Sequence, residues 1–220
     1  MIHVDPPFDL GESLKGTQTY VDELGAAQTK IINKHWEGAV FEFPDVDRSP
    51  SIRGGKSRRS GGTIKAVCVR NISGGALVVK SQLCAFATSW SGGGEANVFG
   101  SVAALATDIN VFCGVGDPEW HGKSTGVEDN DLFWVVIGGR VKVEVKASEN
   151  IAVGDLLASS ANDGEAQEFV TTADTDTNDQ TGAIINLAVA NAQNVIGRAL
   201  EADANVTNGD LLWAQINVKY

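Results

Sequence analysis

The clearest sign of β-structure in this chain reads DLFWVVIGGRVKVEVK, residues 131–146. In its second half valine alternates with charged residues, which places one face on a core and the other face in water. Its first half is apolar on both faces, so we expect it at the centre of a sheet. Because Gly138 and Gly139 stand between the halves, the pattern predicts a β-hairpin that turns at this glycine pair.

An eight-residue unit occurs three times, as NISGGALV (residues 71–78), NIAVGDLL (150–157) and NVTNGDLL (205–212). Asparagine and glycine accept positive φ, and the paired aliphatic residues at the end suit a pleated surface. Each copy therefore predicts a turn that leads into a strand, with Gly154 and Gly209 at backbone angles closed to branched residues. The irregular spacing argues against a solenoid or a propeller.

Composition supports a mainly β fold. The 220 residues are 43% hydrophobic and include 25 glycines and five prolines, which fits many short strands joined by tight turns. We expect a β-sandwich or barrel-like domain of short antiparallel strands over residues 67–220. Further strands are expected near residues 83–87, 98–102, 110–115, 184–190, 195–200 and 211–218. Residues 91–94 are expected to form a flexible loop, and the acidic residues 162–182 a long exposed loop.

Residues 1–66 differ from the rest of the chain and are expected to form an extended N-terminal arm. They hold four of the five prolines, and only residues 20–36 show a helix-like spacing, which predicts one short helix. Residues 48–65 have few large apolar groups and no acids, so this basic segment should be mobile on its own. Its cations would suit docking on an acidic partner or a neighbouring subunit, or they belong to a solvated loop. These candidate partner-binding residues are Arg48, Arg53, Lys56, Arg58, Arg59 and Lys65.

Net charge and hydropathy narrow the possible partners and compartments. The formal charge of −11 disfavours nucleic acid, which selects cationic surfaces. Neither a signal-peptide pattern nor an apolar run of about 18 residues is present, so we expect synthesis in the cytoplasm and no membrane partner. Cys68, Cys84 and Cys113 each lie in an apolar run and are expected to be free and buried.

Phosphate and metal motifs are incomplete. Residues 55–57 read Gly-Lys-Ser, but Pro50 stands where a phosphate-binding loop needs its first glycine. Asp174 and Asp176 stand at alternate positions like the start of a calcium loop, but Ile185 occupies the place of the bidentate glutamate. The three histidines are scattered, which disfavours zinc. We expect no cofactor and no metal.

The candidate catalytic and sugar-binding residues also favour a structural interpretation. Cys113, His121 and Asp129 could be arranged as nucleophile, base and orienting group, but nothing near Cys113 would lower its pKa. We therefore expect that the chain is not an enzyme. The tryptophans could form a sugar-stacking platform, but only Trp90 and Trp120 lie in loop-like sequence, which favours packing.

Several short motifs follow one another within residues 66–218: residues 69–77, 131–139, 150–157 with Asp163 and Gly164 after them, 196–201 and 209–212. Their order resembles that in tailed-phage virion proteins of the capsid decoration, or cement, type. The resemblance implies a mainly β protein without enzymatic activity. It also implies a homotrimer that binds the outer surface of the capsid and stabilises the lattice of the major capsid protein. A tail or fibre-base structural protein is the alternative in the same class, and a carbohydrate-binding β module is the alternative from another class.

Overall fold

The computed structural model describes residues 5–47, 57–87, 101–105, 113–120, 126–169, 195–203 and 210–218. These residues are mainly β, as the composition predicts. The strands are β1 (Thr17–Val21), β2 (Ala27–Ile31), β3 (Val40–Asp47), β4 (Ser57–Asn71), β5 (Leu83–Phe86), β6 (Ser101–Leu105), β7 (Cys113–Gly116), β8 (Leu132–Glu144), β9 (Leu156–Ser159), β10 (Ala166–Glu168), β11 (Gly197–Ala199) and β12 (Leu211–Asn217), and the 3-10 helix η1 covers Lys34–Trp36.

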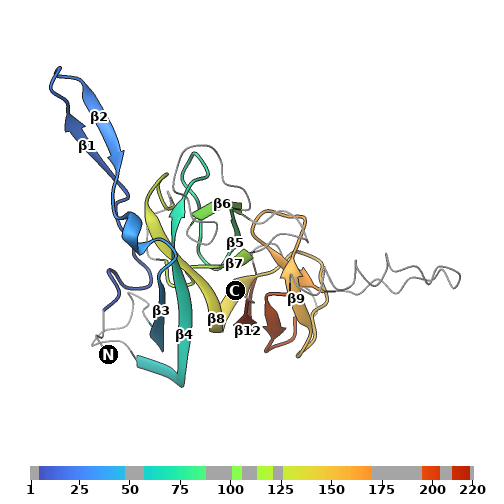
Figure 1. Cartoon of the computed structure of the whole chain (residues 1–220). Helices are drawn as coiled ribbons and strands as arrows, with labels where there is room; N and C mark the ends of the chain where they lie inside the picture. Colours follow the sequence, from blue (N-terminus) through green and yellow to red (C-terminus); the bar gives the residue numbers. More distant parts are fainter. Residues whose placement is uncertain are drawn as a thin grey trace, which may run out of the picture.

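The body of the protein is one ten-stranded sheet that closes partly on itself (Figure 1). Its strand order is β10-β9-β11-β12-β8-β7-β5-β6-β4-β3, and β8 also pairs with β4. The second pairing joins β4, β8, β7, β5 and β6 into a ring, which gives the barrel-like arrangement expected from the sequence. The pairing of β4 with β6 is parallel, and the other pairings of named strands are antiparallel.

Strand β8 is the centre of the sheet, and the hairpin predicted for residues 131–146 is wrong. Leu132–Glu144 form one continuous strand whose first half pairs with β4 and whose second half pairs with β12. Gly139 has φ 110°, and a Cβ there would lie 2.7 Å from the carbonyl oxygen of Thr63. The glycine pair therefore lets the strand bend closely past β4 as it changes partners.

Two hydrophobic clusters lie on opposite faces of β4 and β8. Val67 and Phe133 belong to the cluster enclosed by the ring, while Cys68 and Trp134 belong to the larger cluster outside it. The larger cluster continues under β12, β11 and β9. Because successive side chains point to opposite faces, the two-sided apolar sequence of β8 fills both cores. The predicted central position of this segment is confirmed.

The boundary expected at residue 66 lies inside β4, so the described residues 5–47 and 57–66 do not form a separate arm. Phe8 and Leu10 are buried in the larger cluster, and β3 pairs with β4 in the main sheet. The helix predicted for residues 20–36 is also wrong in its main part. Its residues belong to the β1–β2 hairpin, and only η1 at the end is helical. This hairpin is the part of the N-terminal region that extends away from the body (Figure 1).

The repeated unit forms the predicted turns where the structure describes it. In the first copy Gly74 has φ 82° and Leu77 bridges to Val127. In the second copy Gly154 has φ 94°, which confirms the prediction, and Leu156 begins β9. Gly209 lies outside the described residues.

Several other predicted segments lie partly or wholly outside the described residues. The exposed loop predicted for residues 162–182 is wrong at its start, because β10 pairs with β9 and Ala166 is fully buried. The predicted loop at residues 91–94, the predicted strand at 184–190 and the candidate calcium ligands at 174–178 lie outside the described residues.

Candidate interaction site

The β1–β2 hairpin forms a two-stranded sheet of its own. Every residue of its strands is exposed except Thr17, which is partly exposed. Isolated two-stranded hairpins are at best marginally stable in water, because they bury little apolar surface. A hairpin of this kind needs either a fixed base or a binding partner.

The two faces of the hairpin differ in chemistry. The register pairs Thr17 with Ile31 and Tyr20 with Gln28. Since directly opposite residues share a face, one face carries only uncharged, mostly β-branched side chains: Thr17, Thr19, Val21, Ala27, Thr29 and Ile31. The other face carries Gln18, Tyr20, Gln28 and Lys30, with the Lys30 ammonium 5.9 Å from the centre of the Tyr20 ring. We call the first of these the uncharged face.

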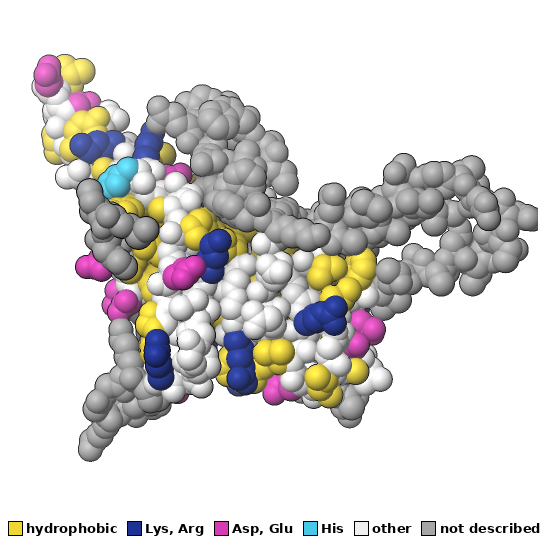
Figure 2. Space-filling view, turned by 60° about the horizontal axis from the view of Figure 1, so that its bottom comes forward, with side chains coloured by type: hydrophobic (Ala, Val, Ile, Leu, Met, Phe, Trp, Pro, Cys, Tyr) yellow, Lys and Arg dark blue, Asp and Glu magenta, His cyan; other side chains and the backbone are white. Residues whose placement is uncertain are grey.

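The tip of the hairpin is held by Asp22. Its Oδ1 accepts hydrogen bonds from the backbone nitrogens of Leu24, at 3.0 Å, and Ala26, at 2.8 Å. Its Oδ2 accepts a 2.9 Å bond from Gln28 Nε2, and this bond is the largest cause of the lowered pKa of Asp22. The tip presents Leu24 with 94% of its surface exposed. Figure 2 shows acidic and hydrophobic side chains side by side at this tip.

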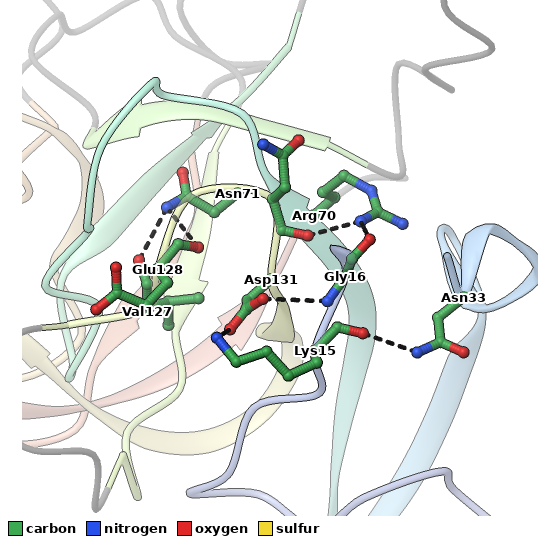
Figure 3. Close-up of polar contacts among 9 residues, drawn as sticks. Lys15, Gly16, Asn33, Arg70, Asn71, Val127, Glu128 and Asp131 are labelled. Atoms are coloured by element: carbon green, nitrogen blue, oxygen red, sulfur yellow. Dashed lines mark hydrogen bonds and ion pairs between the residues drawn. The ribbon is translucent and has the colours of Figure 1, made fainter. Parts of the chain in front are cut away.

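Arg70, near the end of β4, ties both ends of the hairpin to the body, and Figure 3 shows its contact with Gly16. Its guanidinium donates to the carbonyl oxygens of Gly16, at 3.0 Å, and Ile32, at 2.8 Å, on either side of the hairpin. It also donates to Asn130 O at 2.6 Å and pairs with Glu37 at 2.5 Å. The Arg70 side chain is only 3% exposed, and charge-assisted bonds of this kind are strong and directional.

Asp131 completes the base beside Arg70 (Figure 3). Its Oδ1 accepts a 3.1 Å bond from Gly16 N, and its Oδ2 pairs with Lys15 Nζ at 2.9 Å. The hydrogen bond and charge of Asp131 raise the pKa of Lys15. A Cβ at Gly16 would overlap the Asn130 carbonyl oxygen, so this close approach requires glycine. The contacts of Arg70 and Asp131 therefore fix the position at which the hairpin leaves the body.

The basic residues singled out in the sequence are only partly placed by the structure. Arg48, Arg53 and Lys56 lie outside the described residues, while Arg58, Arg59 and Lys65 are on β4. The expectation of a mobile segment is therefore wrong for residues 57–65. Arg58 and Lys65 are exposed, but Arg59 pairs with Asp45 and Glu119 and donates to Val46 O at 2.8 Å.

Sequence reasoning missed Arg70 and Asp131. The sequence did contain a sign that Arg70 is buried and paired, because a single charged residue follows the apolar run Val67–Val69 in a strand-like segment. Its four partners, Gly16, Ile32, Glu37 and Asn130, lie far from it in the chain and could not be read from local sequence.

The cysteines are free and buried, as predicted. Burial raises the pKa of Cys68 and of Cys113 to about 12, so both thiols are protonated at neutral pH. A nucleophilic cysteine needs the opposite shift. His121, its candidate base, lies outside the described residues, and Asp129 instead accepts a 3.1 Å hydrogen bond from Gly74 N.

The tryptophans that the structure describes are mostly packed inside the protein. Trp134 and Trp120 are buried, and Trp36 packs against Phe41 with ring centres 6.2 Å apart. Trp213 is partly exposed but lies among cationic side chains, and Trp90 is outside the described residues. This arrangement favours the packing interpretation over a sugar-stacking platform.

The described residues contain no group of three or more His, Cys, Asp or Glu side chains that could hold a metal ion. Over the same ranges, no helix has the length and apolar character needed to cross a membrane.

Comparison with known proteins shows similarity to solved structures alone. No protein-family model and no curated protein sequence matches the chain. Among solved structures, the chain is similar to the N base of the head fiber gp8.5 of bacteriophage phi29, with 16% identity and a TM-score of 0.36. The match covers 71% of this chain and 99% of that one.

Proposed function

We propose that this chain is a phage virion structural protein of the capsid decoration type. In this proposal it assembles as a homotrimer, binds the outer surface of the capsid and stabilises the lattice of the major capsid protein. The observation that carries the proposal is the β1–β2 hairpin, which extends from the body, pairs with no other strand among the described residues and is fixed at its base by Arg70.

The chemistry of the hairpin supports a protein partner. Its uncharged face can be buried without desolvating a charge, which would cost several kcal/mol per ion. Both hairpin strands are also edge strands, and their free backbone groups can pair with a strand of a neighbouring subunit. Binding there would provide the burial that the isolated hairpin lacks.

The acidic body supports the same role. A net charge of −11 keeps copies soluble and apart before assembly. An interaction through an uncharged hairpin face avoids this repulsion. The order of sequence motifs that resembles decoration proteins points in the same direction.

Two alternatives predict different binding partners. A tail or fibre-base protein would use the same hairpin at another place on the virion. A carbohydrate-binding module would need an open aromatic face. Among the described residues, the two partly exposed tryptophans are Trp36, which packs against Phe41, and Trp213, which has cations over its ring.

Immunogold labelling of intact virions tests the proposal. Antibodies against the chain should label capsid faces in electron micrographs, and particles lacking the chain should lose the label. Label confined to the tail would support the tail alternative. Absence of label from all virions, with binding to a polysaccharide instead, would overturn the proposal.

A further inference from the structure

A second surface, separate from the hairpin, gathers positive charge around Trp213. Strand β12 places Trp213 directly opposite Lys142 of β8. Arg140 lies two residues earlier on β8 and therefore shares the same face. The Trp213 ring centre is 4.8 Å from the Arg140 guanidinium, 5.6 Å from Lys142 Nζ and 5.5 Å from the Arg59 guanidinium.

These side chains line a hollow of about 270 Å³ to which Lys80 also contributes. Leu211 and Pro118 add apolar surface to its wall. We call this hollow the Trp213 pocket. It is formed by residues from β4, β8 and β12 and from the segments before β5 and after β7, so no single stretch of sequence reveals it.

The charges in the Trp213 pocket are not balanced. Arg59 is neutralised by Asp45 and Glu119. Among the described residues, none of the other three cations (Lys80, Arg140 and Lys142) forms an ion pair. Cations that line one pocket repel one another, and a surface cation–π contact contributes only about 0.5–1 kcal/mol. An anionic group in the pocket would relieve this repulsion.

We propose that the Trp213 pocket binds a carboxylate side chain from an acidic segment of a partner protein. Arg140 offers the planar, two-donor geometry that suits a carboxylate, and Lys80 and Lys142 add further donors. The aliphatic part of a glutamate would pack on Trp213 and Leu211. Nucleic acid is the less suitable polyanion, because the chain as a whole carries −11 and would repel an extended phosphate backbone.

The test measures binding of a fluorescein-labelled decaglutamate peptide to the full chain by fluorescence anisotropy at low salt. The variant R140Q/K142Q should weaken binding about tenfold, because each cation of a partly exposed pair contributes a modest amount. The control K65Q removes an exposed cation of β4 outside the pocket and should leave the affinity within about twofold. K80Q, which changes an exposed residue outside the named strands, provides a second variant if the β8 changes disturb folding.

Three outcomes would overturn the proposal. The first is no measurable binding of decaglutamate by the unaltered chain. The second is an equal loss in K65Q and R140Q/K142Q, which would indicate non-specific attraction. The third is tighter binding of single-stranded DNA, or full competition by inorganic phosphate at equal charge concentration, because either would assign the pocket to phosphate groups. None of these outcomes depends on whether the chain is a capsid protein.

Discussion

At the residue scale, Arg70 fixes the base of the hairpin. Its guanidinium satisfies carbonyl oxygens on both sides of the hairpin and neutralises Glu37. A buried ion pair is weak support for overall stability, since two charges must be desolvated, but it specifies geometry strongly. Here the specified geometry is the direction in which the hairpin leaves the body.

Replacing Arg70 with methionine should lower the free energy of unfolding by about 3–5 kcal/mol, because the largely buried Glu37 side chain would lose its cation and three carbonyl groups would each lose a donor. Urea unfolding monitored by circular dichroism measures this change. The control is R58M, at an exposed position of the same strand, which should change stability by less than about 0.5 kcal/mol. Equal effects of the two changes would contradict the assigned role of Arg70.

Gly154 tests the repeated turn. Its φ of 94° is unfavourable for a branched side chain, although a Cβ there would meet no atom within 4 Å. G154V should therefore destabilise through backbone strain alone, by about 1–3 kcal/mol. Gly75 occupies the matching place in the first copy, lacks a positive φ and also has open space around it. The melting temperature should fall clearly for G154V and little for G75V, and an equal fall would contradict the strain argument.

Asp22 makes the hairpin tip sensitive to acid. Its folded-state pKa is lowered, first by the Gln28 hydrogen bond and then by the Ala26 amide. The stabilisation is therefore present above the ordinary Asp pKa and is lost as the pH falls through the lower folded-state value. NMR shifts of the Ala26 amide should report loosening of the tip only below the ordinary value of 3.8. In Q28A the transition should move to higher pH, and an unchanged midpoint would contradict the role of Gln28.

At the element scale, β8 shows how far local sequence specifies the fold. The alternation after Gly139 placed Val141 and Val143 in the core, and both are buried. The glycine pair, however, is equally compatible with a turn and with a bend in a continuous strand. The strand stays continuous because β8 pairs with β4 before the glycines and with β12 after them. Nothing in the neighbouring sequence indicates these long-range pairings.

The hairpin shows a second limit of the sequence. Leu24, Ala27 and Ile31 have helical spacing, but Thr17, Thr19 and Val21 also alternate with polar residues, as a strand requires. The segment forms a hairpin and not a helix because Asp22 stabilises the turn between the two strands and Arg70 binds the backbone at both ends of the hairpin. Pairing between distant strands brings Arg70 close to its partners at the hairpin base. The same kind of pairing brings the cations together around Trp213.

The hairpin should be removable without unfolding the body. Ile32 N donates a 2.8 Å hydrogen bond to Gly16 O, so the two ends are already adjacent. Replacing residues 17–31 with Asn-Gly should leave the melting temperature of the body nearly unchanged, because the removed side chains are exposed. Deleting residues 1–66, by contrast, should abolish folding, since Phe8, Leu10 and Phe43 belong to the larger core cluster. Differential scanning calorimetry distinguishes the two variants, and a folded 67–220 fragment would contradict this account of the core.

At the scale of the whole molecule, salt should affect contacts through the two candidate surfaces in different ways. A body with charge −11 opposes self-association at low salt, and added salt weakens that repulsion. Contacts through the uncharged face should survive at high salt, because burial of apolar groups is not screened. Contacts through the Trp213 pocket should weaken as the Debye length falls from about 10 Å at 0.1 M to about 3 Å at 1 M.

This difference gives a prediction for the proposed homotrimer. If the hairpin joins the copies, analytical ultracentrifugation at concentrations on the order of 10 µM should show a trimer at 1 M salt at least as abundant as at 0.1 M. The Asn-Gly hairpin replacement should sediment as a folded monomer under both conditions, while R140Q/K142Q should remain trimeric. A trimer that persists without the hairpin would place the association surface on the body. A trimer that dissociates in salt would assign it to charged contacts, because an interface of threonine, valine, alanine and isoleucine side chains has no charge for salt to screen.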